Sequence, residues 1–299
     1  MSLFASESRS TLIDPQWLQP LSDPPDGKPV CREADLKLMA RYLVDLFRIG
    51  KARNLFIYGK PGTGKTACAK HLLGEVAKHA SETNAPVLTA YVNAGKTRTP
   101  YYTLAEIVKQ LGVAVPSAGW QTFRLKHILE GLLTEKSVLL AIDEVDSILL
   151  KEKEPLVYYL SRQPKTTLIL ISNTVDDVVR LPERALSTLQ PVLMPLEPYT
   201  REETMQILRN RLEHACRPNM ITDKLLNTIA EAVSKGGDIR FGFRVLLAAA
   251  LLTEKAGKQT IEASDIASAL KEENRVSRIK ELEALRDKFL KLKRKYEKD

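Results

Sequence analysis

One glycine-rich stretch constrains this chain more than any other feature of its sequence. It fits the pattern G-x-x-x-x-G-K-[ST] and consists of Gly59, Lys60, Pro61, Gly62, Thr63, Gly64, Lys65 and Thr66. A short apolar run, 54–58, precedes it, and a helical pattern follows it. Because glycine permits positive φ and a close approach of backbone amides, a strand, this loop and a helix together predict a cradle for a triphosphate. Residues 59–66 are called the phosphate loop below.

The whole phosphate loop is expected to bind ATP or ADP. Its backbone amides would contact the phosphates, and the start of the following helix would add a partial positive charge. Lys65 would reach the β- and γ-phosphates, and the Thr66 hydroxyl would hold Mg²⁺. The chain is therefore predicted to be a slow ATPase that converts ATP and water to ADP and phosphate.

Two other predicted strands end in polar side chains suited to the same site. The apolar run 138–142 is followed by Asp143 and Glu144, and the run 167–172 is followed by Asn173. Since the carboxyl ends of parallel strands share one edge of a sheet, these residues are expected beside the phosphate loop. Asp143 would bind Mg²⁺ directly or through water, Glu144 would polarise the attacking water, and Asn173 would orient that water or contact the γ-phosphate.

The order of apolar runs and helical stretches predicts the fold class. Short apolar runs lie at 54–58, 87–92, 138–142 and 167–172, separated by helical stretches. This alternation predicts an α/β fold, with a parallel sheet flanked by helices. After about Pro198 only helical segments follow, around 200–215, 222–234, 240–255 and 263–270. We expect an irregular N-terminal arm over 1–30, an ATPase domain over 31–198, an all-helical lid domain over 199–270 and a charged C-terminal helix over 271–299.

Composition limits the partners and the location. The net charge of +8 favours an anionic partner, with nucleic acid the obvious candidate. No run approaches the ~18 consecutive apolar residues that a membrane span needs, and the polar N-terminus lacks the pattern of a signal peptide. Cys31, Cys68 and Cys216 have neither metal-ligand nor disulfide spacing. They are expected to be small buried residues in a reducing, cytoplasmic setting.

Several motifs together resemble one family, the AAA+ ATPases, and within it the origin-recognition (Orc/Cdc) clade of archaeal replication initiators. The resemblance runs from about Pro29 to Leu270. Besides the phosphate loop it rests on Arg-Glu-Ala-Asp-Leu at 32–36, Ile-Asp-Glu-Val-Asp at 142–146, Ile-Ser-Asn at 171–173, Leu-Pro-Glu-Arg-Ala-Leu-Ser at 181–187 and Gly-Asp-Ile-Arg at 237–240. It implies a P-loop NTPase sheet followed by a helical lid, and a protein of replication initiation whose nucleotide state controls its grip on DNA.

The resemblance also implies two arginines that act on the γ-phosphate. Arg240 is similar to the lid arginine that contacts ATP bound to its own subunit. Arg184 is similar to the arginine finger that reaches into the site of a neighbour, which is either a second copy or a related AAA+ subunit. Arg180 lies one turn earlier and is an alternative for that role.

In this family a segment inserted after the second strand grips duplex DNA. The corresponding stretch here begins at Asn93 and continues through a helix to Gly119. Lys96, Arg98 and Lys109 are expected to neutralise phosphates, so that affinity for DNA would fall steeply as salt rises. The same resemblance implies a cytoplasmic, nucleoid-associated protein of archaeal origin, with the replicative helicase or its loader as a further partner.

One departure from the family leaves alternatives open. Family members usually continue into a C-terminal winged-helix domain that reads the origin sequence, and this chain has only the charged stretch 271–299 at that point. Either the sequence stops before that module, or this member does without it. Two other functions fit the motifs: an adaptor ATPase of a plasmid or mobile element, and an ATPase of the clamp-loader or repair type.

Overall fold

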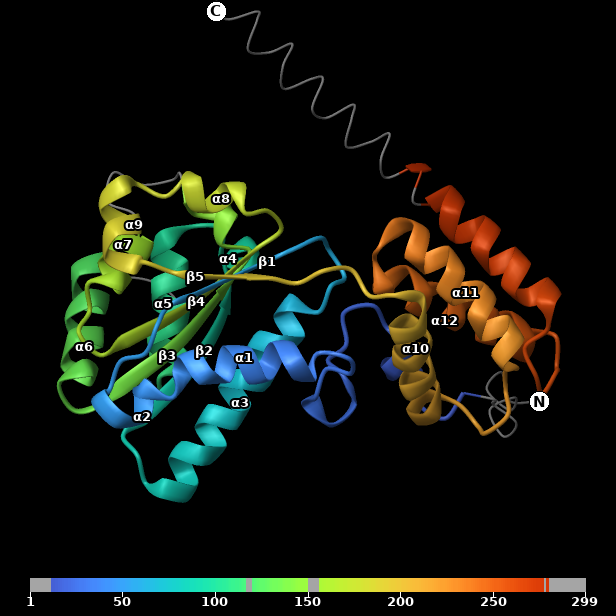
Figure 1. The fold of residues 1–299 in the computed structure, drawn as a ribbon, viewed down its shortest axis with the longest axis horizontal. Helices are drawn as coiled ribbons and strands as arrows, with labels where there is room; N and C mark the ends of the chain where they lie inside the picture. Colours follow the sequence, from blue (N-terminus) through green and yellow to red (C-terminus); the bar gives the residue numbers. More distant parts are fainter. Residues whose placement is uncertain (1–11, 117–119, 150–155, 277, 280–299) are drawn as a thin grey trace, which may run out of the picture. The chain divides into compact units, whose positions relative to one another are not determined.

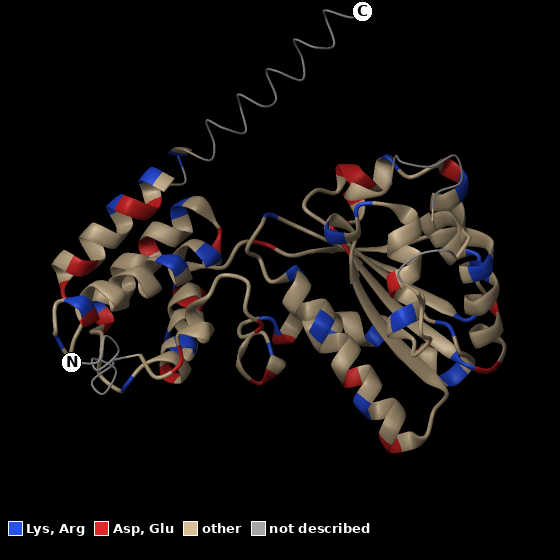
Figure 2. Ribbon diagram, turned by 180° about the vertical axis from the view of Figure 1, so that it is seen from behind, with Lys and Arg blue, Asp and Glu red and all other residues tan. Residues whose placement is uncertain are grey.

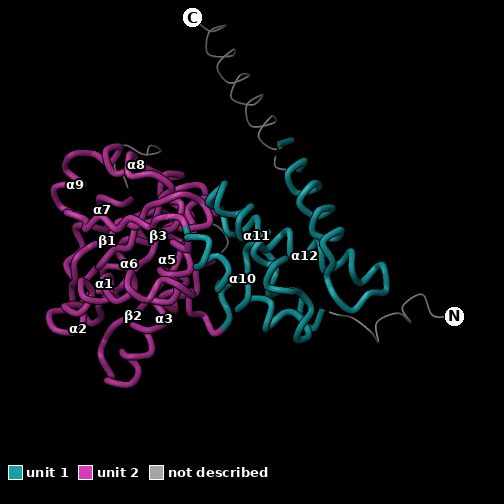
Figure 3. Tube along the Cα trace, turned by 45° about the vertical axis from the view of Figure 1, so that its right-hand side comes forward, with its two compact units in different colours: residues 1–25, 199–299 teal, residues 26–198 magenta. Residues whose placement is uncertain are grey.

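The computed structural model describes residues 12–116, 120–149, 156–276, 278 and 279. These residues fall into two compact units (Figure 3). One unit comprises residues 26–198, and the other joins residues 12–25 to the described residues from Tyr199 onward. The second unit is called the helical unit below.

The unit of residues 26–198 is a parallel sheet between two layers of helices (Figure 1). Its strands are β1 (Leu55–Tyr58), β2 (Val87–Asn93), β3 (Ser137–Asp143), β4 (Thr166–Ser172) and β5 (Val192–Pro195), all parallel, in the order β2-β3-β4-β1-β5. Its helices are α1 (Glu33–Leu43), α2 (Asp45–Ile49), α3 (Lys65–Thr83), α4 (Ala94–Thr97), α5 (Pro100–Gln110), α6 (Thr122–Glu135), α7 (Leu156–Ser161), α8 (Asp176–Val179) and α9 (Glu183–Leu189). The predicted fold class is confirmed.

Residues in alternate positions of each central strand pack against opposite helical layers. In β3, Leu139 and Ala141 pack in the cluster that includes residues of α1, α2 and α3. Leu140 and Ile142 pack in the cluster that includes residues of α5, α6 and α7. Because both faces of β3 are covered, all seven of its residues are buried, which explains its continuous apolar run.

The sequence patterns did not predict the edge strand β5. This strand has four residues, only Met194 among them is buried, and Leu193 is 45% exposed. A short edge strand that ends in Pro195 has no continuous apolar run to reveal it. Its position is set by pairing with β1. The pairing extends one residue beyond β5, because the Leu196 N–H donates to the Tyr58 carbonyl oxygen at 2.8 Å.

Asn54, just before β1, ties three segments to the start of that strand. Its buried side-chain amide donates to the Leu189 carbonyl oxygen at 2.7 Å and accepts from the Leu168 backbone N–H at 2.8 Å. Its backbone carbonyl accepts from the Val192 N–H at 2.8 Å. Strands β4 and β5 and the end of α9 are therefore positioned around β1 by one residue.

The helical unit contains α10 (Arg201–Ala215), α11 (Asp223–Gly236) and α12 (Ile239–Lys255), and residues 263–276 are helical as well. A capping box starts α10: the Glu203 N–H donates to Thr200 Oγ1 at 3.1 Å, and the Thr200 N–H donates to the Glu203 carboxylate at 2.8 Å. Gly237, with φ of 75°, ends α11, and Asp238 caps α12. These caps delimit the helices that the sequence patterns predicted here.

Of the irregular arm expected over 1–30, residues 1–11 lie outside the described residues, and residues 12–25 are irregular apart from one short turn. They include the 3₁₀ turn η2 (Pro15–Leu18), which packs against α10 and α12 of the same unit. Arg211 of α10 holds them, since its guanidinium donates at 2.7–3.2 Å to the carbonyl oxygens of Trp17, Ser22 and Asp23. Burial lowers the pKa of Arg211 to about 10, so its charge is kept at neutral pH. A residue distant in sequence orders this segment, and local patterns do not reveal such a contact.

The predicted charged helix over 271–299 is described only in part. Residues 271–276 continue the helix that begins at residue 263, and residues 280–299 lie outside the described residues. In the part of the chain that the structure describes, no helix is long and apolar enough to cross a membrane.

Two of the three cysteines are buried as expected, and Cys31 is partly exposed instead. Burial raises the pKa of Cys68 to about 12 and that of Cys216 to about 11. Both side chains therefore remain neutral thiols at physiological pH.

We expect Asn54→Ala to lower the free energy of unfolding by about 2–4 kcal/mol, because the Leu168 N–H and the Leu189 carbonyl both lose their buried partner. Urea denaturation followed by circular dichroism measures this. Thr188→Ala removes an exposed hydroxyl that bonds within α9 and serves as the control, with an expected change below about 1 kcal/mol. Equal stability of the Asn54→Ala variant and the parent would contradict the role given to this amide.

Candidate nucleotide-binding site

Three glycines give the phosphate loop its backbone conformation. Gly59, Gly62 and Gly64 have φ of 149°, 79° and 86°, values that favour glycine. At Gly59 space is also limiting, because a Cβ atom there would lie 2.2 Å from the Leu196 carbonyl oxygen. The loop therefore requires glycine both for its φ values and for its contact with the chain that leaves β5.

Lys65 places a buried ammonium group inside the loop. Its side chain is 8% exposed, and Nζ donates to the carbonyl oxygens of Gly59 at 2.6 Å and Lys60 at 2.8 Å. Helix α3 begins at Lys65, and its N-cap residue is Gly64, which provides no side-chain cap. Amides of a first helical turn together with an ammonium group form an environment suited to an anion.

Asp143, at the end of β3, lies beside the first turn of α3. The Thr66 hydroxyl donates to its Oδ2 at 2.6 Å, and the Glu144 backbone N–H donates to its Oδ1 at 2.9 Å. Asp143 is 5% exposed, so these donors replace water around its carboxylate. The two residues predicted to hold Mg²⁺ are thus in direct contact.

Tyr91 of β2 is a third donor to Asp143 and was not predicted from the sequence. Its phenol donates to Asp143 Oδ2 at 2.9 Å. Burial and the neighbouring carboxylate raise the pKa of Tyr91, which keeps the phenol protonated as a donor. The pairing of β2 with β3 brings the two side chains together, and nothing in the local sequence indicates that pairing.

Glu144 is exposed and is held by β2. It has φ of 51°, and its Oε1 accepts from Asn93 Nδ2 at 3.2 Å. Gly95 lies so close that a Cβ there would be 1.9 Å from Glu144 Oε2. Asn93 is a second residue that the prediction of the site missed. One signal in the sequence could have revealed it: Asn93 directly follows the apolar run 87–92, just as Asp143 and Asn173 directly follow apolar runs.

The strand register brings these residues to one edge of the sheet. Asn93 at the end of β2 pairs with Asp143 at the end of β3. Ser172 at the end of β4 pairs in the same way with Tyr58 at the end of β1. Asn173 follows Ser172 at this edge and is exposed. The edge thus carries the phosphate loop, the acidic pair and two asparagines.

Arg180 and Arg184 lie on the outer part of the same unit. Arg180 pairs at 2.8 Å with Asp177, which also accepts a short hydrogen bond from the Ser172 hydroxyl. Arg184, at the start of α9, is exposed, with its guanidinium 5.1 Å from the centre of the Tyr158 ring. An exposed arginine on a short helix is accessible to a neighbouring molecule.

Arg240 belongs to the helical unit. It lies in the first turn of α12, where its backbone N–H donates to the Asp238 side chain at 3.0 Å, and it is half-buried. The phosphate loop is in the other unit, so the predicted contact of Arg240 with a γ-phosphate stays a prediction.

The three basic residues predicted to contact DNA are all exposed and follow β2. Lys96 is in α4, Arg98 follows that helix with φ of 60°, and Lys109 is near the end of α5. Lys109 lies 3.9 Å from the Glu106 carboxylate, which offsets part of its charge. Other Lys and Arg residues lie on helices and loops of both units (Figure 2).

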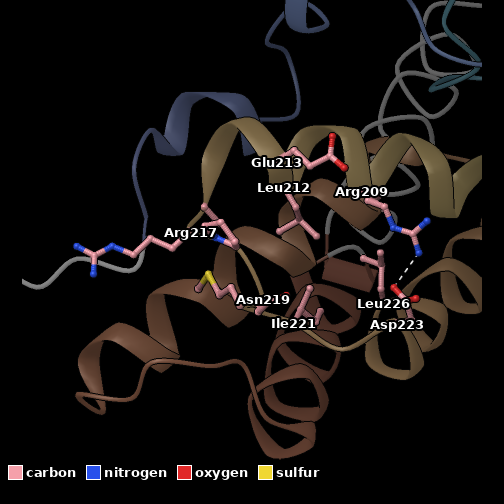
Figure 4. Close-up of a pocket in the computed structure, with 11 residues that line it drawn as sticks. Arg209, Leu212, Glu213, Arg217, Asn219, Ile221, Asp223 and Leu226 are labelled. Carbon is pink, nitrogen blue, oxygen red and sulfur yellow. Dashed lines mark hydrogen bonds and ion pairs between the residues drawn. The ribbon is translucent and has the colours of Figure 1, made fainter.

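The helical unit contains a pocket of about 330 Å³ that holds none of the predicted site residues (Figure 4). Its lining is apolar at Leu212, Ile221 and Leu226. At one side Arg209 and Asp223 form an ion pair of 2.7 Å.

Comparison with known proteins gives two domain matches in succession. The family model of the AAA domain matches residues 48–176, which include the phosphate loop and Asp143. The model of the Cdc6 AAA+ ATPase-type lid domain matches residues 205–271, which include Arg240.

The chain is also similar to replication proteins of Pyrococcus and Sulfurisphaera. An ORC1-type DNA replication protein of Pyrococcus horikoshii is 30% identical over 245 residues, which are 77% of this chain and 58% of the relative. ORC1-type DNA replication protein 1 of Sulfurisphaera tokodaii is 31% identical over 256 residues, which are 82% of this chain and 64% of the relative. This chain thus spans less than two thirds of either relative.

A solved structure agrees with these matches. The Aeropyrum pernix ORC1 protein in complex with DNA superposes with a TM-score of 0.79 at 28% identity, covering 88% of this chain and 70% of that one. In this chain a parallel sheet that carries the phosphate loop and Asp143 is followed by the match to the Cdc6-type lid. The chain belongs to the Orc/Cdc6 origin-recognition family of AAA+ ATPases.

Proposed function

We propose that this chain binds ATP with Mg²⁺ at the phosphate loop, hydrolyses it slowly, and binds duplex DNA under control of the nucleotide in the initiation of replication. The observation that carries the proposal is the 2.6 Å contact between the Thr66 hydroxyl and the Asp143 carboxylate, next to the buried Lys65. A hydroxyl, a carboxylate and an ammonium group gathered at the start of one helix suit Mg-ATP and few other ligands.

The phosphate loop is proposed to bind the phosphates through its backbone. The positive φ of its three glycines suits a loop whose backbone amides approach an anion, and α3 would add the positive end of its dipole. Lys65 would exchange its loop carbonyl partners for β- and γ-phosphate oxygens. Because its ammonium group is already positioned by the loop, little side-chain ordering is left for binding.

The donor set at the strand edge fits Mg²⁺, which prefers hard oxygen ligands. Thr66 and Asp143 would hold the ion, each supplying one oxygen to it directly or through water. When bound, the ion neutralises charge that develops on the phosphate oxygens.

Glu144 is proposed to orient and polarise the attacking water, since it is exposed at the same edge as the loop. Asn93, which donates to its carboxylate, would restrain the position of that side chain. Asn173 would contact the water or the γ-phosphate, and Arg240 would reach the γ-phosphate from the lid. Arg184 would act on ATP bound to a neighbouring subunit.

Duplex DNA is the proposed partner because relatives at 30–31% identity are named as DNA replication proteins, and an ORC1 relative was solved with DNA. These comparisons favour replication initiation over the adaptor and the clamp-loader alternatives. Lys96, Arg98 and Lys109 are the proposed phosphate contacts. Other subunits of this kind, and a helicase or its loader, are proposed protein partners.

Substitutions at Lys65 and Glu144 should separate binding from hydrolysis. Lys65→Ala should weaken ATP and ADP binding at least about a hundredfold, because charge-assisted hydrogen bonds are lost. Glu144→Gln should keep ATP bound but stop hydrolysis. Calorimetry and phosphate release measure the two effects, with Lys78→Ala on the exposed side of α3 as the control. Native hydrolysis by the Glu144→Gln variant would show that another group activates water.

Asn93→Ala should release the Glu144 carboxylate from its hydrogen bond and leave it free to reach the attacking water. We expect faster ATP turnover, by about two- to tenfold, with an unchanged dissociation constant for ATP. Asn227→Ala, at an amide bound to Arg201 in the helical unit, is the matched control. Slower turnover in the Asn93→Ala variant would mean that the amide positions the base rather than restraining it.

Replacing Lys96, Arg98 and Lys109 together by Gln should weaken duplex DNA binding and make it less dependent on salt. Each lost phosphate contact lowers the slope of log K against log salt by about 0.9. Fluorescence anisotropy across a salt series measures the slope. The control is a triple Gln variant at Lys224, Lys235 and Lys255, which removes the same charge from the helical unit. An equal decrease in the salt dependence of DNA binding in this control would refute the assigned contacts.

A further inference from the structure

Arg32 is a buried charged residue beside the phosphate loop, and the roles assigned above do not use it. It precedes α1 and is 7% exposed. Its Nε donates to the Thr63 carbonyl oxygen of the loop at 3.2 Å. Nη1 donates to Asp35 at 3.1 Å, and Nη2 makes a short hydrogen bond to the Glu197 carbonyl oxygen. All three nitrogen atoms of the guanidinium therefore have a partner within the protein.

We propose that Arg32 is a positioning residue for the phosphate loop. It would set the direction of one loop amide without touching the nucleotide. This inference rests on the proposed binding of ATP and adds a residue on which that binding depends.

The first step of the argument concerns the peptide between Thr63 and Gly64. The described chain contains no cis peptide bond, so the C=O and N–H of this peptide point in opposite directions. Since the Thr63 carbonyl is directed at Arg32, the Gly64 N–H is directed away from it. Gly64 precedes Lys65, and this amide is one of those that the G-x-x-x-x-G-K-[ST] pattern turns toward a phosphate.

The second step concerns the chain that leaves β5. The Leu196 carbonyl lies against Gly59 at the start of the loop, and Glu197 is held by Arg32 near the loop's other end. A planar guanidinium can donate to two carbonyl oxygens at fixed angles, as a flexible ammonium cannot. Arg32 thereby keeps the phosphate loop in register with the segment 196–198, where this unit ends.

The charge of Arg32 alone does not account for this arrangement. Asp35 forms an ion pair with it at 3.1 Å, which offsets the positive charge close to its source. The geometry therefore indicates that Arg32 acts through directed hydrogen bonds and not through long-range attraction of the phosphates by its charge. The substitution by Lys, which keeps the charge but loses the planar fork, distinguishes these two effects.

The test measures dissociation constants of ADP and ATP with Mg²⁺ by calorimetry, using the full chain well below the melting temperature of each variant. We expect Arg32→Gln and Arg32→Lys to bind both nucleotides about tenfold more weakly. Hydrogen exchange of a peptide covering the loop, without nucleotide, should be faster in both. A merely structural role would lower the melting temperature and leave the dissociation constants of the folded variants unchanged.

Lys51→Gln is the matched control. Lys51 belongs to the same unit and donates to the carbonyl oxygens of Ser161 at 3.3 Å and Gln163 at 2.8 Å, after α7. Its loss should lower the melting temperature without changing the affinity for nucleotide. A tenfold loss of affinity in this control as well would overturn the specific role of Arg32.

The remaining outcomes separate the inference from the function on which it rests. Native affinity in the Arg32→Gln variant, or full rescue by Arg32→Lys, overturns the inference and leaves ATP binding intact. If the Arg32→Gln variant does not fold, the affinity of the Arg32→Lys variant is the test. Native affinity of that variant would refute the role proposed for the planar guanidinium. If the parent protein binds neither ADP nor ATP, the proposed function fails and the inference fails with it.

Discussion

The hydrogen bond between Thr66 and Asp143 depends on more of the structure than any other contact in the site. Thr66 follows β1, Asp143 ends β3, and β4 lies between these two strands in the sheet. The contact therefore requires α3 to begin over the edge of β4, with its apolar side packed on the sheet. Correct parallel register and a covered face are both needed before the hydroxyl and the carboxylate can meet.

Hydrogen bonds and close contacts from several residues fix the positions of β1 and the phosphate loop. Asn54 joins β4, β5 and α9 to the start of the strand. At the other end, the Leu196 carbonyl lies against Gly59, and Arg32 bonds to the loop and to Glu197. The phosphate loop thus contacts other parts of the chain at both Gly59 and Thr63. A loop that is already ordered loses little conformational entropy when an anion binds.

At this edge of the sheet the acidic pair has two different environments. Asp143 is buried and accepts hydrogen bonds from Thr66, Tyr91 and the Glu144 backbone, so its position is defined by several donors. Glu144 is exposed, and its one described side-chain partner is Asn93. A well-fixed carboxylate suits a metal ligand, and a weakly held one suits a group that must handle water. These different surroundings support the roles proposed for the two adjacent acids.

The amino-acid sequence by itself determined the fold class, the phosphate loop, the acidic strand end and the helices of the helical unit. These features are local: a glycine pattern, apolar runs of strand length and helical periodicity are set by residues close together in the chain. Only the tertiary structure decided the edge strand β5, the packing of residues 12–25 on α10, and the contacts of Tyr91, Asn93 and Arg32. Each of these depends on hydrogen bonds between residues far apart in sequence, in a strand order that no local pattern encodes.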